Sequence, residues 1–335
     1  MRIFELQDQA RGETLRLVAL FALAVAATVL GVHLALAACW WLLQLVSPFP
    51  LAFPRLFFTV NVGVTLLLVL GGWWIETSNL QAAGGAERLA RRMGAREARP
   101  GSSHGEQRLC NIVDEVCIAA HMPRPQVMVL PRHEAINAFA TGWDPSDAVV
   151  AVTQGALDLL TREELQGMVA HECSHVHEGD TRLNMQLAGM VSGLELVWRF
   201  GETIRERGGL AMLFGTAIMA TGVAGWTAGR MLQASVSRQR EFLADARAVQ
   251  WTRSRDGLGG VLRKALTQQQ HPEDRPSDPA WPTSGQHLLL LAARDDRRGW
   301  FAAHPPLAVR IQRIYGRPMP PLPLPVDRAV SVTWA

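Results

Sequence analysis

Two long stretches without charged residues lie near the start of the chain, after a charged segment that ends at Arg16. No Asp, Glu, Lys or Arg occurs between Arg16 and Arg55, and a second uncharged stretch continues from there to Glu76. Each is long enough to cross a bilayer as a helix, which takes roughly 20 apolar residues. The connecting turn, residues 47–54, contains three prolines and is too short for a domain. The pattern predicts a pair of membrane-spanning helices joined by this turn.

The basic residues around this hairpin predict its orientation. Three arginines precede it and three follow it, at positions 2, 11, 16, 88, 91 and 92, whereas between the two apolar stretches only Arg55 is charged. Because basic residues concentrate on the cytoplasmic side, we expect both ends of the hairpin in the cytoplasm. The apolar run 17–46 is far longer than the core of a cleavable signal peptide, so we expect it to remain in the mature protein.

A globular pattern follows the hairpin. Residues 77–106 are rich in Ala, Gly, Arg and Ser, which is typical of a linker or of a charged surface helix. Apolar residues then recur at helical spacing from 109 to 120, before two prolines end the helix. Three strand-like stretches, near 127–130, 136–141 and 148–153, predict a small sheet.

A further helix is predicted from about residue 162 to residue 177. Thr161 and Glu164 form the T-x-x-E pattern of a capping box, and an apolar stripe continues from Leu165 to Val176. Residues 171–175 of this helix read HECSH, which matches HExxH. Two histidines four residues apart lie on one helical face and can bind one zinc ion.

A third ligand is expected farther along the chain. Glu172 lies next to the first histidine, in position to take a proton from water rather than to bind the metal. Catalytic zinc takes three protein ligands, and Glu241, 66 residues beyond His175, is our candidate for the third after His171 and His175. Asp245, one helical turn later, is expected to accept the free ring N–H of a ligand histidine.

At this point the chain resembles the membrane-embedded gluzincin peptidases, which include the HtpX-type bacterial quality-control proteases and the CAAX prenyl endoproteases. The matching motifs are Asn137-Ala138-Phe139-Ala140-x-Gly142, the HExxH with Asp180 after it, the run from Arg240 to Asp245, and His304-Pro305-Pro306 with Arg310. The resemblance implies that residues 137–140 form an edge strand that binds the substrate main chain. It also implies that Asp180 and Asp245 support the ligands and that His304 and Arg310 stabilise the reacting carbonyl.

Two positions depart from the family pattern, and two assignments have structural alternatives. Phe242 stands where tyrosine is common, and Ala303 stands where a hydroxyl residue often precedes the His-Pro pair. The oxyanion of amide hydrolysis needs a donor besides the metal, and the chain has only one tyrosine, Tyr315. His304 and Arg310 are therefore the better candidates, although His304 can simply start a helix and Arg310 can be a surface residue.

A second pair of membrane helices is expected between the two halves of the site. Residues 208–229 are uncharged and long enough to span a bilayer, whereas Glu195 interrupts 183–199. His175 and Glu241 bind one metal only if the chain between them crosses the membrane an even number of times. The arginines of the connection argue against an outside loop, but the resemblance favours a hairpin, so we predict four crossings in all.

Composition agrees with a membrane enzyme rather than with a nucleic-acid-binding protein. Apolar residues make up 48% and charged residues 19% of the 335 residues, with a net charge of +3. The arginines flank apolar segments instead of forming a basic stripe interleaved with aromatics, so no nucleic acid is expected. The four cysteines show no C-x-x-C spacing, which indicates neither a zinc knuckle nor a disulfide framework.

We therefore predict a mainly α fold with a small β-sheet, a gluzincin-type zinc metalloprotease domain and transmembrane helices. The predicted parts are a hairpin (1–77), two halves of the catalytic domain (78–182 and 236–316), a second hairpin (183–235) and a Pro-rich tail (317–335). The expected localisation is the bacterial inner membrane, multi-pass, with a cytoplasmic catalytic domain.

The predicted activity is that of a zinc metalloendopeptidase with one Zn2+ per chain, acting on membrane or misfolded proteins in HtpX-like quality control. Its expected partners are polypeptide substrates and the lipid bilayer. The alternatives are a CAAX-type prenyl-protein endoprotease and a non-proteolytic membrane scaffold or chaperone with structural zinc. A site-2-type intramembrane protease is disfavoured, because charged residues flank the HExxH helix.

Overall fold

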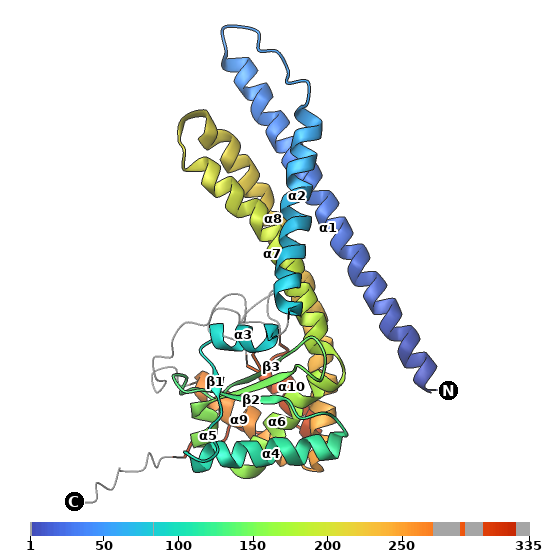
Figure 1. Ribbon diagram of the computed structural model, residues 1–335, viewed down its shortest axis with the longest axis vertical. Helices are drawn as coiled ribbons and strands as arrows, with labels where there is room; N and C mark the ends of the chain where they lie inside the picture. The colour runs from blue at the N-terminus through green and yellow to red at the C-terminus, as the bar shows by residue number, and fades with distance from the viewer. Residues whose placement is uncertain (1, 83, 271–288, 292–303, 326–335) are drawn as a thin grey trace, which may run out of the picture. The chain divides into compact units, whose positions relative to one another are not determined.

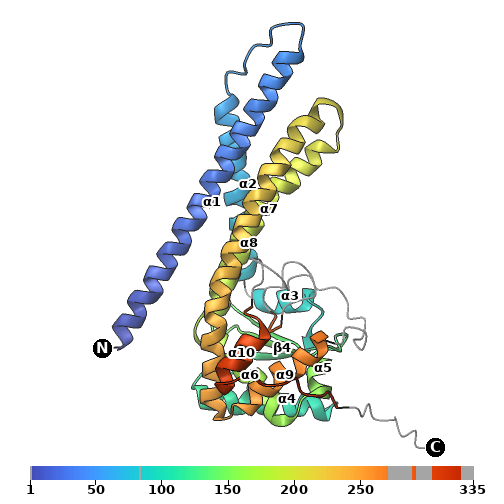
Figure 2. The same ribbon diagram turned by 180° about the vertical axis from the view of Figure 1, so that it is seen from behind.

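The computed structural model describes residues 2–82, 84–270, 289–291 and 304–325. The elements are α1 (Arg2–Val46), α2 (Phe57–Gln81), α3 (Gly85–Arg92), β1 (Arg96–Glu97), α4 (His104–Ala120), β2 (Gln126–Leu130), β3 (Ala138–Thr141), β4 (Val149–Thr153), α5 (Gln154–Leu159), α6 (Arg162–His177), α7 (Asp180–Arg205), α8 (Gly209–Thr252), α9 (Asp256–Gln270) and α10 (Leu307–Tyr315). The chain forms two compact units (Figures 1 and 2). The helical unit comprises Met1–Asn79 and Gln186–Gln233, and the sheet unit comprises Leu80–Met185 and Ala234–Ala335.

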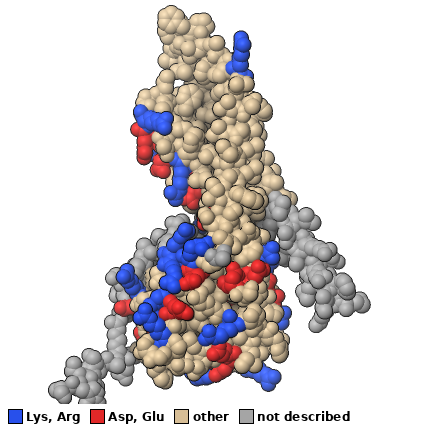
Figure 3. Space-filling view, viewed as in Figure 1, with Lys and Arg blue, Asp and Glu red and all other residues tan. Residues whose placement is uncertain are grey.

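Three helical stretches among the described residues are long and apolar enough to cross a membrane. They are Ala19–Val46, Phe57–Gln81 and Gly209–Ala234. The first two coincide with the predicted N-terminal hairpin, and the third contains the uncharged stretch 208–229. The remaining predicted span, residues 183–199, lies in helix α7, which is not apolar enough to be counted among these stretches. In Figure 3 the charged side chains gather on the sheet unit, whereas the long helices expose few of them on this face.

Glycines allow α7 and α8 to approach each other closely within the helical unit. A Cβ atom added to Gly215 or Gly222 of α8 would lie 2.3 Å from Arg205 N or 2.5 Å from Trp198 N of α7. A Cβ atom added to Gly201 of α7 would lie 2.4 Å from the backbone N of Met219 in α8. These distances are too short for any side chain at the three positions. Glycine therefore lets the backbones of α7 and α8 pack directly against each other.

The sheet unit is built on a four-stranded mixed sheet with the strand order β1-β2-β4-β3. Strands β2 and β4 are parallel, whereas β1 and β3 pair antiparallel to them, so β3 forms one edge among these strands. Alternate strand residues point to opposite faces. One face packs in a core with α4, α6 and α9, and the other packs against α3. The predicted mainly α fold with a small sheet is confirmed.

The first part of the sheet unit differs from the sequence prediction. Residues 77–106 are not merely a linker or a charged surface helix, because Leu89 and Ala90 of α3 are buried against the sheet. A short strand, β1, also lies in this stretch and pairs with β2. The three predicted strands are present as β2, β3 and β4, but the short helix α5 was not predicted.

Helix α6 is fixed at its start by side chains. Thr161 and Glu164 form the predicted capping box, in which each side chain accepts the backbone N–H of the other residue. The Glu164 carboxylate also pairs with Lys264 of α9, with its Oε2 2.6 Å from Nζ. Gly167 lets α9 approach, because a Cβ atom there would lie 2.2 Å from the backbone N of Leu258. These contacts hold the helix that carries HExxH against the rest of the unit.

Candidate metal centre

Two turns of α6 and one turn of α8 bring three metal-ligand side chains together. Nε2 of His171 and Nε2 of His175 are 3.2 Å apart. Glu241 Oε2 lies 3.6 Å from His171 Nε2, and Glu241 Oε1 lies 3.5 Å from His175 Nε2. Zinc bonds of about 2.0–2.1 Å in a tetrahedron would separate the ligand atoms by about 3.3–3.4 Å. The spacing therefore fits a tetrahedral metal ion, and no other His, Cys, Asp or Glu cluster of this kind occurs among the described residues.

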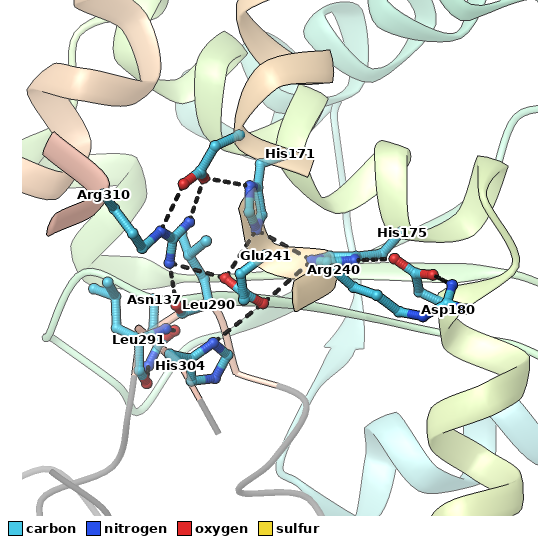
Figure 4. A network of polar contacts seen from close by, with 11 residues as sticks. Asn137, His171, His175, Asp180, Arg240, Glu241, Leu290, Leu291, His304 and Arg310 are labelled. Atoms are coloured by element: carbon cyan, nitrogen blue, oxygen red, sulfur yellow. Dashed lines mark hydrogen bonds and ion pairs between the residues drawn. The ribbon is translucent and has the colours of Figure 1, made fainter. Parts of the chain in front are cut away.

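Carboxylates hold the outward-facing nitrogens of both histidines (Figure 4). His171 Nδ1 lies 3.1 Å from Asp245 Oδ1, and His175 Nδ1 lies 2.9 Å from Asp180 Oδ2. The other Asp180 oxygen accepts a hydrogen bond from Arg240. A carboxylate at Nδ1 favours the tautomer that leaves Nε2 free for a metal. The chain thus orients both imidazoles toward the same point.

Arg310 and His304 surround the third predicted ligand. His304 Nδ1 lies 3.1 Å from Glu241 Oε1, and Arg310 Nη1 lies 2.9 Å from Glu241 Oε2. Arg310 also donates two hydrogen bonds to Asp245, from Nε at 2.9 Å and from Nη2 at 2.6 Å. Its side chain is fully buried. The surface alternative for Arg310 is therefore wrong, and the guanidinium belongs to the centre.

These contacts shift the acid–base equilibria of the carboxylates. Burial opposes ionisation, but His304, Arg310 and His175 hold the pKa of Glu241 well below its ordinary value. Likewise, Arg310 and His171 lower the pKa of Asp245 despite its burial. Burial works against the charge of Arg310 as well, yet its two carboxylate partners raise the pKa of the guanidinium. Both carboxylates are thus ionised at neutral pH.

Glu172 has a different environment from these paired carboxylates. It is buried, and burial is the main cause that raises its pKa to about 8. The backbone N–H of Ala140 in β3 donates to the carboxylate. Oxygen Oε1 has no hydrogen-bond partner within the part of the chain that the structure describes. A buried carboxylate with a free oxygen is able to accept and return a proton.

The predicted substrate strand lies at the edge of the sheet, as expected. Asn137 is fixed to β4, since its N–H donates to Thr153 Oγ1 at 3.0 Å and its carbonyl accepts the Thr153 N–H at 3.0 Å. Phe139 and Ala140 continue the strand toward Glu172. The side of β3 that faces away from β4 is covered by residues 289–291 of the same chain, where the Leu290 N–H donates to Ala138 O at 2.8 Å.

The structure brings all the predicted site residues into one unit. His171, Glu172, His175, Asp180, Glu241, Asp245, His304 and Arg310 form one polar network with the edge strand 137–140 beside it. His177, excluded from the ligands by helical geometry, pairs with Glu178 instead. Sequence reasoning gave no role to Arg240, although it begins one of the matching motifs, and it missed the segment 289–291. Arg240 directly precedes Glu241, but nothing in the sequence connects it with Asp180.

Comparison with known proteins gives this geometry its context. Residues 103–317 match the family model described as Peptidase family M48. The chain belongs to peptidase family M48. Among its relatives, a "Protease HtpX homolog" from Streptococcus uberis is 30% identical over 264 residues, which cover 75% of this chain and 85% of the relative. Homologs with the same description from Dictyoglomus thermophilum and Ligilactobacillus salivarius are each 35% identical, over 62% of this chain and 68% and 72% of the relatives.

Membership of the M48 family confirms the resemblance drawn from the motifs. The chain is a metalloprotease, and a hydrolase of this family requires a metal cofactor and polypeptide substrates. The apolar helices and the HtpX homologs identify an integral membrane protein. An enzyme is therefore indicated rather than a non-proteolytic scaffold.

Proposed function

We propose that the chain is a membrane-anchored zinc endopeptidase that hydrolyses membrane or misfolded proteins in HtpX-like quality control. The proposal depends chiefly on the arrangement of His171, His175 and Glu241, whose ligand atoms all lie within 4.8 Å of one another. Two imidazoles and one carboxylate, with a fourth position left to water or substrate, form the donor set of zinc peptidases. Nitrogen donors also disfavour Mg2+ and Ca2+, which prefer oxygen.

The side chains around the ligands support hydrolysis by an activated water molecule. Zinc, when bound, lowers the pKa of water toward about 7 and polarises a carbonyl. Glu172 takes a proton from the attacking water and passes it to the leaving amine. Arg310 and His304 stabilise the charge that develops on the carbonyl oxygen. A contact in the structure supports this role for Arg310: its Nη1 donates a hydrogen bond to a main-chain carbonyl, Leu290 O, at 3.3 Å.

The substrate is proposed to bind along β3 as an additional strand. Main-chain hydrogen bonds to a sheet edge tolerate many sequences, as a quality-control protease requires. Residues Asn137 to Ala140 are the proposed binding strand, and their position beside Glu172 supports this. A CAAX-type endoprotease is the alternative within the same chemistry, and it differs in requiring a prenylated chain end.

Cleavage assays on the full-length protein in detergent test both the chemistry and the substrate class. We expect about one zinc ion per chain and cleavage of casein and of an unfolded membrane protein. A chelator should abolish both reactions, and added Zn2+ should restore them. Cleavage confined to prenylated peptides would favour the CAAX-type alternative. A zinc-loaded protein that cleaves none of these substrates would contradict the proposal.

We further propose four membrane crossings with both termini and the metal centre in the cytoplasm. The arginines around the first hairpin support this orientation. The close packing of α7 on α8 supports the fourth crossing, because a helix that lies backbone to backbone against a membrane span must cross with it. An even number of crossings also lets His175 and Glu241 reach one metal ion.

Cysteine labelling in intact cells tests this topology. Single cysteines in the turn 47–54 and at Thr203 should react with an impermeant reagent, whereas one at Pro100 should not. All three lie at exposed positions, and the native cysteines are buried. Labelling at Pro100 would reverse the orientation. Protection at Thr203 alone would leave only the first hairpin in the membrane.

A further inference from the structure

Residues 289–291 occupy the edge that the proposed function assigns to the substrate. Leu289 forms an antiparallel bridge with Phe139, and Leu290 N–H donates to Ala138 O at 2.8 Å. All three leucines are buried. A strand edge offers one row of N–H and C=O groups, and two chains cannot pair with the same row at once. The segment and a substrate strand therefore exclude each other at Ala138 and Phe139.

Polar groups at the metal centre hold this segment by its main chain. The side-chain amide of Asn137 donates to Leu291 O and accepts from Leu291 N–H, both at 3.1 Å. Arg310 Nη1 donates to Leu290 O at 3.3 Å and lies 2.9 Å from Glu241 Oε2 (Figure 4). One nitrogen thus contacts both a peptide carbonyl and a proposed metal ligand. These contacts involve peptide groups, which any polypeptide can supply.

We propose that Leu289–Leu291 is an internal competitor of the substrate, which leaves the β3 edge when a polypeptide binds. This inference rests on the proposed function, because it takes β3 as the substrate strand. Asn137, Ala138 and Arg310 bind the segment through the groups that a bound peptide would use. The free enzyme is thereby held in a closed state, and its apparent affinity for substrate is reduced by the fraction of closed molecules.

The side chains of the segment indicate which substrates displace it. Leu289 packs in the core that contains Phe139, whereas Leu290 and Leu291 pack in the core on the other face. Removing three buried leucines is unfavourable unless other apolar groups take their place. A substrate with successive leucine-like side chains fills these positions, but a polar one leaves them empty. We therefore expect the preferred substrates to be extended apolar segments of the kind that unfolded membrane proteins expose.

A disulfide between β3 and the segment tests the competition within one protein. Phe139 and Leu289 face each other as a non-hydrogen-bonded antiparallel pair, in which side chains are closest, so Phe139→Cys with Leu289→Cys allows a cross-link. We expect the oxidised protein to cleave casein at least about tenfold more slowly than the same sample after reduction. The single variant Leu289→Cys controls for oxidation elsewhere. Equal activity before and after reduction, at equal zinc content, would overturn the inference.

A second variant loosens the segment without changing β3. Leu290→Pro removes the N–H that bonds Ala138 O, whereas the matched variant Leu290→Met keeps both the N–H and the side-chain volume. Loss of one such bond should lower KM about fivefold with kcat unchanged in Leu290→Pro only. A zinc-loaded Leu290→Pro protein with an unchanged or higher KM would mean that the segment is a permanent strand. Absence of chelator-sensitive cleavage in the wild type and both variants would instead contradict the proposed function.

Substrate peptides provide the last readout. A peptide with three consecutive leucines should bind more tightly than one of equal length with three serines, and this preference should be smaller in Leu290→Pro. Equal KM values for the two peptides would exclude exchange of the buried leucines.

Discussion

Replacing Arg310 by methionine should destabilise the protein more than any change to a surface arginine. The guanidinium is fully buried and lies between two ionised carboxylates, Glu241 and Asp245. Removing one partner of a buried ion pair costs about 3–5 kcal/mol, because the remaining charge has no compensation. A unit of roughly 200 residues loses about 2–4 °C in Tm per kcal/mol. We therefore expect the metal-free Arg310→Met protein to melt roughly 6–20 °C below the wild type.

The control for this prediction is Arg247→Met. Arg247 is partly exposed and pairs with Glu178, with Nε 3.1 Å from Oε1, and an ion pair of this kind contributes about 0–1 kcal/mol. Thermal unfolding of the chelated proteins, followed by tryptophan fluorescence in one detergent, compares the two variants directly. Arg310→Lys should fall between them, because an ammonium keeps the charge but not the two-pronged contact with Asp245. If Arg310→Met and Arg247→Met melt together, the electrostatic account of this centre is wrong.

Further predictions separate the roles of the remaining side chains. Glu172→Gln should keep its zinc yet lose at least about a hundredfold in casein cleavage, the scale of a general base; near-normal turnover would reject that role. Glu241→Ala should lose the metal in zinc titrations, whereas Asp245→Ala should weaken binding about 10–100-fold, and the reverse order would exchange their roles. Both carboxylates have lowered pKa values, so they stabilise the metal-free protein fully above their ordinary pKa near 4. In a Glu172→Gln background, which removes the carboxyl whose pKa is raised to about 8, the Tm of the metal-free protein should therefore fall as the pH drops below about 4 through the lowered pKa values; a Tm that rises over that range would contradict this.

The site was predictable where its chemistry is local in the sequence. The capping box at Thr161 and the spacing of His171 and His175 depend on one helix, whose period fixes which side chains share a face. Glu241 followed from the number of ligands that zinc needs, and β3 from its short apolar pattern. The capping box, the histidine pair and β3 are each encoded by a few neighbouring residues, so they can be predicted without knowledge of the fold.

The remaining features depend on contacts between distant parts of the chain. Arg310 was a candidate only through the family resemblance, and its ion pairs with Glu241 and Asp245 were not visible in the sequence, because they depend on the meeting of α8 and α10. Leu289–Leu291 lies in a stretch with no periodic pattern, so its pairing with β3 was not visible. Of the predicted Pro-rich tail, 317–335, the structure describes only residues 317–325. The fourth crossing was predicted from the family resemblance and from the need for an even number of crossings, because hydropathy alone does not show that the glycines of α8 place α7 against it.

The continuity of α8 limits how this enzyme can be shortened. The helix runs from Gly209 to Thr252, and its apolar stretch ends at Ala234, seven residues before Glu241. Seven residues of helix extend about 10 Å, or two turns. A soluble fragment cut at Ala234 would begin with helix ends that fray, and the fraying would reach the residue that completes the metal-binding set. Water solubility and an intact third ligand therefore oppose each other in this chain.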